Sequence, residues 1–152
     1  MLAVRFYDVV LWVHITAVIV AFGALFAYPV FLGVNAQAPL GQRAQFHHLQ
    51  VAFSKRVTGP VIGLVLLAGI YLATDGDLWS EVWVTVPLIL LFVIAGLGAS
   101  VLRQGELGMI AASEGGDEPA YATALATTRT WTLVTMGLIV VAVFFMTVKP
   151  FA

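Results

Sequence analysis

Residues 82–102 read VWVTVPLILLFVIAGLGASVL, an apolar stretch without a charged side chain. A helix needs about 20 mostly apolar residues to cross the hydrocarbon core of a bilayer. Three further stretches have the same character, at residues 9–34, 57–73 and 131–148. The sequence therefore predicts an all-α protein, a polytopic membrane four-helix bundle that forms one transmembrane domain over residues 1–152.

The composition of the whole chain agrees with this prediction. Of the 152 residues, 61% are hydrophobic and 10% are charged, whereas a soluble domain has about 45–50% apolar and about 25% charged residues. The mean hydropathy is +1.01. A net charge of −1 argues against a nucleic-acid partner, because phosphate binding needs a basic face. The absence of cysteine excludes disulfides and thiolate metal sites. The lipid bilayer is the expected partner.

The first apolar stretch begins close to the N-terminus, as a signal peptide would. Only Arg5 precedes it as a positive charge, and Asp8 is a counter-charge. The stretch is also longer than the roughly 7–15 apolar residues of a signal sequence. We therefore expect a retained helix.

The Lys and Arg side chains predict an orientation. The connections after the first and third apolar stretches hold most of them, namely Arg43, Lys55, Arg56, Arg103 and Arg129. Positive charges favour the cytoplasmic side. Both termini are thus expected outside a bacterial inner (cytoplasmic) membrane. Lys55 and Arg56 are expected to anchor the second helix to anionic headgroups.

Helix boundaries in the connections predict helices that run past the bilayer. Pro39 suits a helix start, and Asp117 followed by Pro119 is typical of an N-cap with a first-turn proline. The pair Gly115-Gly116 should end the preceding helix. The second and fourth helices then have roughly 30–35 residues, or about 45–50 Å. We expect both to extend on the cytoplasmic side.

Small residues predict where the helices pack, because lipid gives no hydrophobic driving force between them. Ala17 and Ala21 share one face of the first helix with His14, and Gly59-x-x-x-Gly63 opens the second helix. These residues are expected to mediate contacts within the chain. The alternative is the contact face of a homodimer or of a larger membrane complex.

His14 is the one ionisable side chain well inside a predicted span. Three interpretations stay open: a neutral histidine hydrogen-bonded to a backbone carbonyl or a threonine, a haem axial ligand, or part of a proton relay. Met146 is expected at the same level and is a candidate second haem ligand, since His/Met is a known pairing. No catalytic residue and no metal site is predicted.

The neighbouring residues His47 and His48 cannot serve one site, because adjacent helical residues diverge by about 100°. They lie in the predicted cytoplasmic connection, where His47 shares a polar stripe with Arg43 and Gln50. We expect both histidines to be solvated at the membrane interface.

Short motifs along most of the chain carry a family resemblance. They are LWVHI at 11–15, Arg56-Val57-x-x-Pro60, LAGIY at 67–71 and the ending Val148-Lys149-Pro150. In these the chain resembles bacterial four-helix membrane proteins grouped as a domain of unknown function. The resemblance implies a small bacterial inner-membrane protein, and we expect it to be a non-catalytic or accessory subunit.

Two better-understood groups are distantly similar. HemJ-type protoporphyrinogen oxidase, a four-helix membrane protein, has a haem-linked histidine in its first helix, which corresponds to His14 here. Its arginine and proline in helix two correspond to Arg56 and Pro60, and its ending corresponds to 149–151. Its lysine early in helix three has no counterpart in 83–87, which read WVTVP. This resemblance implies b-type haem as the alternative function. CopD-like membrane domains also have a helix histidine, which implies copper handling as a third option.

The orientation can be measured with a reporter fused at Ala152. We expect a fused alkaline phosphatase to be active, because that enzyme folds only outside the cytoplasm, and a fused green fluorescent protein to be dark. A fluorescent fusion without phosphatase activity would reverse the assigned orientation.

Overall fold

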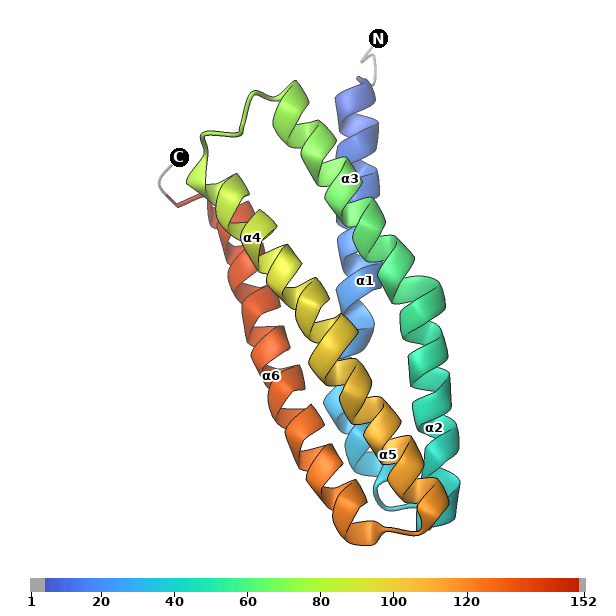
Figure 1. Cartoon of the computed structure of the whole chain (residues 1–152). Helices are drawn as coiled ribbons and strands as arrows, with labels where there is room; N and C mark the ends of the chain where they lie inside the picture. The colour runs from blue at the N-terminus through green and yellow to red at the C-terminus, as the bar shows by residue number, and fades with distance from the viewer. Residues whose placement is uncertain (1–4, 151–152) are drawn as a thin grey trace.

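Four long helices form an elongated bundle in the computed structural model, which describes residues 5–150 (Figure 1). The second and third long helices are each composed of two α-helices joined by a π-helical turn. In chain order the elements are α1 (Phe6–Asn35), α2 (Leu40–Phe53), the π-turn Ser54–Thr58, α3 (Gly59–Asp75), α4 (Val82–Leu97), the π-turn Gly98–Leu102, α5 (Arg103–Gly115) and α6 (Glu118–Val148).

The predicted all-α membrane four-helix bundle is confirmed. Each long helix is long and apolar enough to cross a membrane, and the described residues contain no strand. The chain is therefore a multi-pass membrane protein. The four helices have 30, 36, 34 and 31 residues, or about 45–54 Å at 1.5 Å per residue. All four, and not only the second and fourth, exceed the roughly 30 Å hydrocarbon core.

The turn between α5 and α6 follows its sequence signals. Gly116 adopts the left-handed conformation with φ 72° and ends α5, a conformation that costs glycine little. Asp117 then caps α6, because its Oδ1 accepts the backbone N–H of Ala120 at 2.9 Å. Pro119 lies in the first turn, where no intrahelical N–H bond is lost. The predicted helix end and N-cap are confirmed.

The two π-turns have local causes. Pro60 cannot donate a backbone hydrogen bond, and the N–H of Gly59 bonds instead to the Ser54 carbonyl, five residues earlier. In the other long helix the Ser100 hydroxyl donates to the Gly96 carbonyl at 2.6 Å. Such back-bonding from serine bends helices. Both turns mark the transition from the apolar half of the bundle to its more polar half.

Helix packing differs between the two halves. In one half α2 packs on α5, and α6 packs on α5; a buried apolar cluster lies there, comprising Tyr28, Leu32, Met109, Ala112 and Tyr121. In the other half α1 packs on α3 and α4 packs on α6, but α3 and α4 contact each other little and diverge towards the termini (Figure 1).

The small residues that were expected to mediate helix packing differ in their surroundings. Ala17 and Ala21 are buried against neighbouring helices, with exposed fractions of 4% and 3%. A Cβ added to Gly63 would meet no atom within 4 Å, and one on Gly59 would meet only the Ser54 carbonyl of the same long helix. At neither glycine, therefore, would an added Cβ meet another helix within residues 5–150. At Gly105 it would, because a Cβ there would lie 2.0 Å from the Thr128 hydroxyl oxygen.

Replacing Gly105 should loosen the contact between α5 and α6. We expect Gly105→Ala to lower the free energy of unfolding by about 1–3 kcal/mol, the usual cost of overpacking, measured by denaturant titration in detergent micelles. Thr128→Ala in the same chain should recover part of the loss. Gly108→Ala is the matched control, since its Cβ would meet Ala124 at an ordinary 3.6 Å. Equal stability of both single variants would contradict the packing.

Candidate functional site

An apolar cavity of about 610 Å³ lies where α3 and α4 diverge. Side chains from α1, α3, α4 and α6 line it, most of them leucine, isoleucine, valine and aromatic residues. Ligand sites commonly measure about 300–1,000 Å³ and combine apolar walls with a few polar groups. The polar groups here include His14 from α1 and Lys149 at the end of α6. This cavity is the candidate ligand site.

The ring of His14 is held against α3. Its Nδ1 lies 3.0 Å from the backbone carbonyl oxygen of Val65. A carbonyl only accepts, so Nδ1 carries the proton and Nε2 keeps its lone pair. The ring packs over Gly69, where an added Cβ would lie 3.2 Å from His14 Cε1. The expected hydrogen bond from His14 to a backbone carbonyl is thus present, and it has the form that also orients a metal-ligating histidine.

Met146 lines the same cavity from α6. The two residues that the sequence singles out as haem-ligand candidates thus line one cavity. In the part of the chain that the structure describes, Lys149 is the only charged residue that lines the cavity, and its ammonium group lies 4.3 Å from the ring centre of Trp83. Phe151, which is part of the family-like ending, lies outside the described residues.

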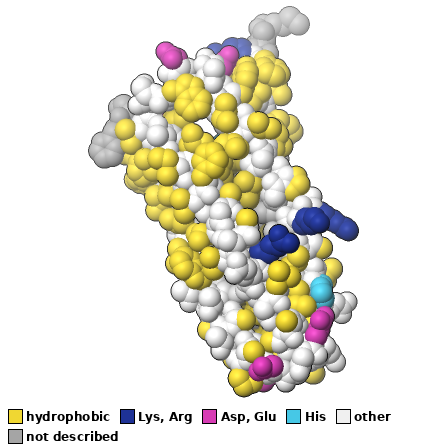
Figure 2. All heavy atoms as spheres, in the orientation of Figure 1, with side chains coloured by type: hydrophobic (Ala, Val, Ile, Leu, Met, Phe, Trp, Pro, Cys, Tyr) yellow, Lys and Arg dark blue, Asp and Glu magenta, His cyan; other side chains and the backbone are white. Residues whose placement is uncertain are grey.

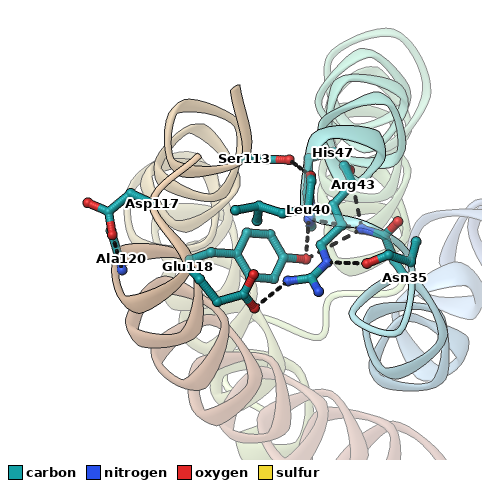
Figure 3. A network of polar contacts seen from close by, with 10 residues as sticks. Asn35, Leu40, Arg43, His47, Ser113, Asp117, Glu118 and Ala120 are labelled. Atoms are coloured by element: carbon teal, nitrogen blue, oxygen red, sulfur yellow. Dashed lines mark hydrogen bonds and ion pairs between the residues drawn. The ribbon is translucent and has the colours of Figure 1, made fainter. Parts of the chain in front are cut away.

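A second polar site lies at the opposite end of the bundle, and we call it the polar clamp: Asn35, Arg43, His47, Glu106 and Tyr121. Figure 3 labels three of its members, Asn35, Arg43 and His47. His47 is completely buried, and its Nδ1 lies 2.8 Å from Glu106 Oε2. Its Nε2 lies 3.1 Å from the Tyr121 hydroxyl and 3.2 Å from the Asn35 amide nitrogen. The clamp joins α1, α2, α5 and α6.

Arg43, a member of the polar clamp, also binds residues outside it. Its Nε donates to the Ala38 carbonyl, and its NH1 donates to Glu118 Oε1, each at 2.8 Å. The guanidinium group also lies 4.7 Å from the ring centre of Tyr121. Figure 3 shows Arg43 between α1 and the carboxylate of Glu118. Both connections at this end are thereby fixed to the bundle.

The hydrogen-bond partners of His47 define its protonation. The amide nitrogen of Asn35 can only donate, so Nε2 accepts and Nδ1 carries the proton. Nδ1 then donates to Glu106 Oε2. The other carboxylate oxygen, Glu106 Oε1, is buried and has no hydrogen-bond partner within residues 5–150. An unpaired buried polar atom is costly. The hydrogen bond from His47 is therefore what compensates the burial of the Glu106 side chain.

The expectation that His47 is solvated is wrong. His48 is exposed and pairs with Glu114 at 2.9 Å, whereas His47 turns inward. The two histidines do point to different surroundings, as the 100° rule predicts. The only sign of this site in the sequence was the polar stripe that His47 shares with Arg43. Such a stripe shows that one face of the helix is polar, but not whether water or another side chain covers it. Sequence alone did not reveal that Glu106, 59 residues away, would cover that face.

Comparisons of the chain with protein-family models, with curated proteins and with solved structures find no match. Over residues 5–150, no three histidine or acidic side chains come close enough to hold a metal ion.

The clamp can be tested against its exposed neighbour. We expect Glu106→Ala to lower the free energy of unfolding by about 2 kcal/mol, because it leaves the buried Nδ1–H of His47 without an acceptor. Glu114→Ala breaks the exposed pair with His48 and should cost less than about 1 kcal/mol. Denaturant titrations in detergent compare the two variants. A Glu106→Ala protein as stable as Glu114→Ala would show that the clamp contributes nothing.

Proposed function

We propose that the chain is a small, non-catalytic accessory protein of the bacterial inner membrane that binds a lipophilic cofactor in the cavity between α1, α3, α4 and α6. The cofactor that these residues fit best is a b-type haem with His14 as an axial ligand. The observation that carries the proposal is the hydrogen bond from His14 Nδ1 to the Val65 carbonyl at 3.0 Å.

The cavity suits such a group in three respects. Its volume of about 610 Å³ falls within the usual range for cofactor sites. The Val65 carbonyl fixes the ring of His14, leaves the Nε2 lone pair available and raises its basicity. The apolar walls keep water from the site. When bound, haem would supply one-electron chemistry, and the chain would hold it and limit solvent access.

Met146 is the proposed second ligand, because it lines the cavity from α6 while His14 lines it from α1. The two side chains thus belong to different long helices, and a group between them would connect α1 with α6. No Asp or Glu lines the cavity in the described chain, so no carboxylate there would compete with His14 and Met146 as a ligand of the haem iron.

The charges support a placement in the bilayer. Lys and Arg side chains stand at mid-height of the bundle in Figure 2. Of the exposed cations, Lys55 and Arg56 lie within the first π-turn, Arg103 directly follows the second, and Arg129 belongs to α6. About 20 residues, or roughly 30 Å, separate Lys55 from Asp75 at the far end of α3, which equals the hydrocarbon thickness. We place these cations at the cytoplasmic headgroups, with Lys55 and Arg56 as anchors and both termini outside.

A homodimer or a larger membrane complex is the proposed partner of the glycine pair on α3. Gly59 and Gly63 allow close helix approach, and in the described part of the chain a Cβ on either would meet no other helix.

The haem proposal is tested by the visible spectrum of the protein purified in mild detergent from haem-replete cells. We expect a Soret band that His14→Ala abolishes, because the axial nitrogen is lost. Met146→Leu should shift the band without abolishing it. His48→Ala is the matched control and should leave the spectrum unchanged. A colourless wild type that haem addition does not convert would refute the proposal.

A further inference from the structure

We propose that the ligand of the cavity is an amphipathic carboxylate: its apolar body lies between α1, α3, α4 and α6, and its acidic group binds Lys149. The inference rests on the proposed function in using the same cavity, but it concerns the opposite end of the ligand from His14. Three observations carry it.

The first observation is the distribution of charge around the cavity. Among residues 5–150, apolar side chains dominate the lining, no carboxylate contributes to it, and Lys149 is the single charged residue. Lys149 is also exposed, so it stands where the cavity meets the outside. A ligand that fills the apolar space while offering a negative group at this edge would match both parts of the site.

The second observation is the way the fold positions this lysine. Helix α6 ends at Val148, and Lys149 adopts a left-handed backbone conformation with φ 50°, which is uncommon for a residue other than glycine. Its N–H bonds to the Phe145 carbonyl at 3.1 Å. The ammonium group lies over the face of Trp83, 4.3 Å from the ring centre. The turn and the aromatic ring hold the charge beside the cavity.

The third observation is that no acidic side chain neutralises Lys149. Asp75, Asp77 and Glu81 belong to the same end of the bundle, yet none is within ion-pair distance of Lys149. The contact with Trp83 uses one side of the ammonium group, which has three N–H donors. The remaining donors suit a carboxylate, which accepts charge-assisted hydrogen bonds.

The experiment uses the full chain in phosphatidylcholine nanodiscs. A dibrominated stearic acid and its methyl ester are titrated at about pH 9, where the fatty-acid carboxyl is ionised, and quenching of tryptophan fluorescence reports occupancy near Trp83. For each protein, the concentration of acid that gives half-maximal quenching is divided by that of the ester. This acid-to-ester ratio is then compared between the wild type and the variants. Because partition into lipid is the same for every variant, it cancels in this comparison.

We expect the acid-to-ester ratio to be about fivefold lower in the wild type than in Lys149→Gln, because the wild type binds the acid more tightly. A change of about fivefold is the effect of an ion pair at an exposed site. Lys149→Arg should retain the preference. Arg5→Gln is the matched control, because Arg5 is a cation at the same end that does not line the cavity, and it should change nothing. Thermal midpoints of the variants show that each is folded.

Equal ratios in the wild type and Lys149→Gln would overturn the proposal, as would a ratio that Arg5→Gln changes equally. Loss of the preference when phosphatidylglycerol replaces part of the lipid would assign Lys149 to phospholipid headgroups and also overturn it. The haem proposal fails separately. His14→Ala should retain the preference for the acid over the ester, because His14 does not bind the carboxylate. A Soret band that depends on His14, together with no preference for the acid, would refute the carboxylate proposal and leave the haem proposal standing.

Discussion

The hydrogen bond between His47 and Glu106 is the interaction on which the shape of the bundle depends. It is a buried link between α2 and α5, which are continuous with α3 and α4, and the buried Ser113 adds a second one by donating to the Leu40 carbonyl. Because an unpaired buried carboxylate or imidazole is costly, the bond fixes how the second and third long helices are aligned. Asn35, Arg43 and Tyr121 extend the constraint to α1 and α6. One end of the bundle is therefore closed by directional contacts.

The other end is built under a different constraint. Lipid gives no hydrophobic driving force for helix association, and the one hydrogen bond between side chain and backbone that joins two helices in the apolar half of the described chain is His14 to Val65. It ties α1 to α3, while α4 packs on α6. Nothing comparable joins α3 to α4, so the space between the two helix pairs becomes the cavity. The same histidine that holds the pair together therefore lines the cavity.

Hydropathy and helix-end signals were enough to predict the spans, because lipid forces every backbone group into an internal hydrogen bond. The N-cap at Asp117 and the stop at Gly116 are local and were equally readable. The role of His47 was not, since a polar stripe looks alike whether water or Glu106 faces it. The glycine pair on α3 shows the same limit, because a small residue permits a close contact without naming the partner.

The most direct test of this two-ended account measures distances between spin labels in nanodiscs. The chain has no cysteine, so pairs can be placed freely on exposed sites. The account predicts a narrow distribution for Leu49 with Leu107 at the clamped end, which broadens in Glu106→Ala. Leu67 with Ile89, across the cavity end, should give a broader distribution. A clamped-end distribution that stays narrow in Glu106→Ala would contradict the claim that this pair fixes the bundle.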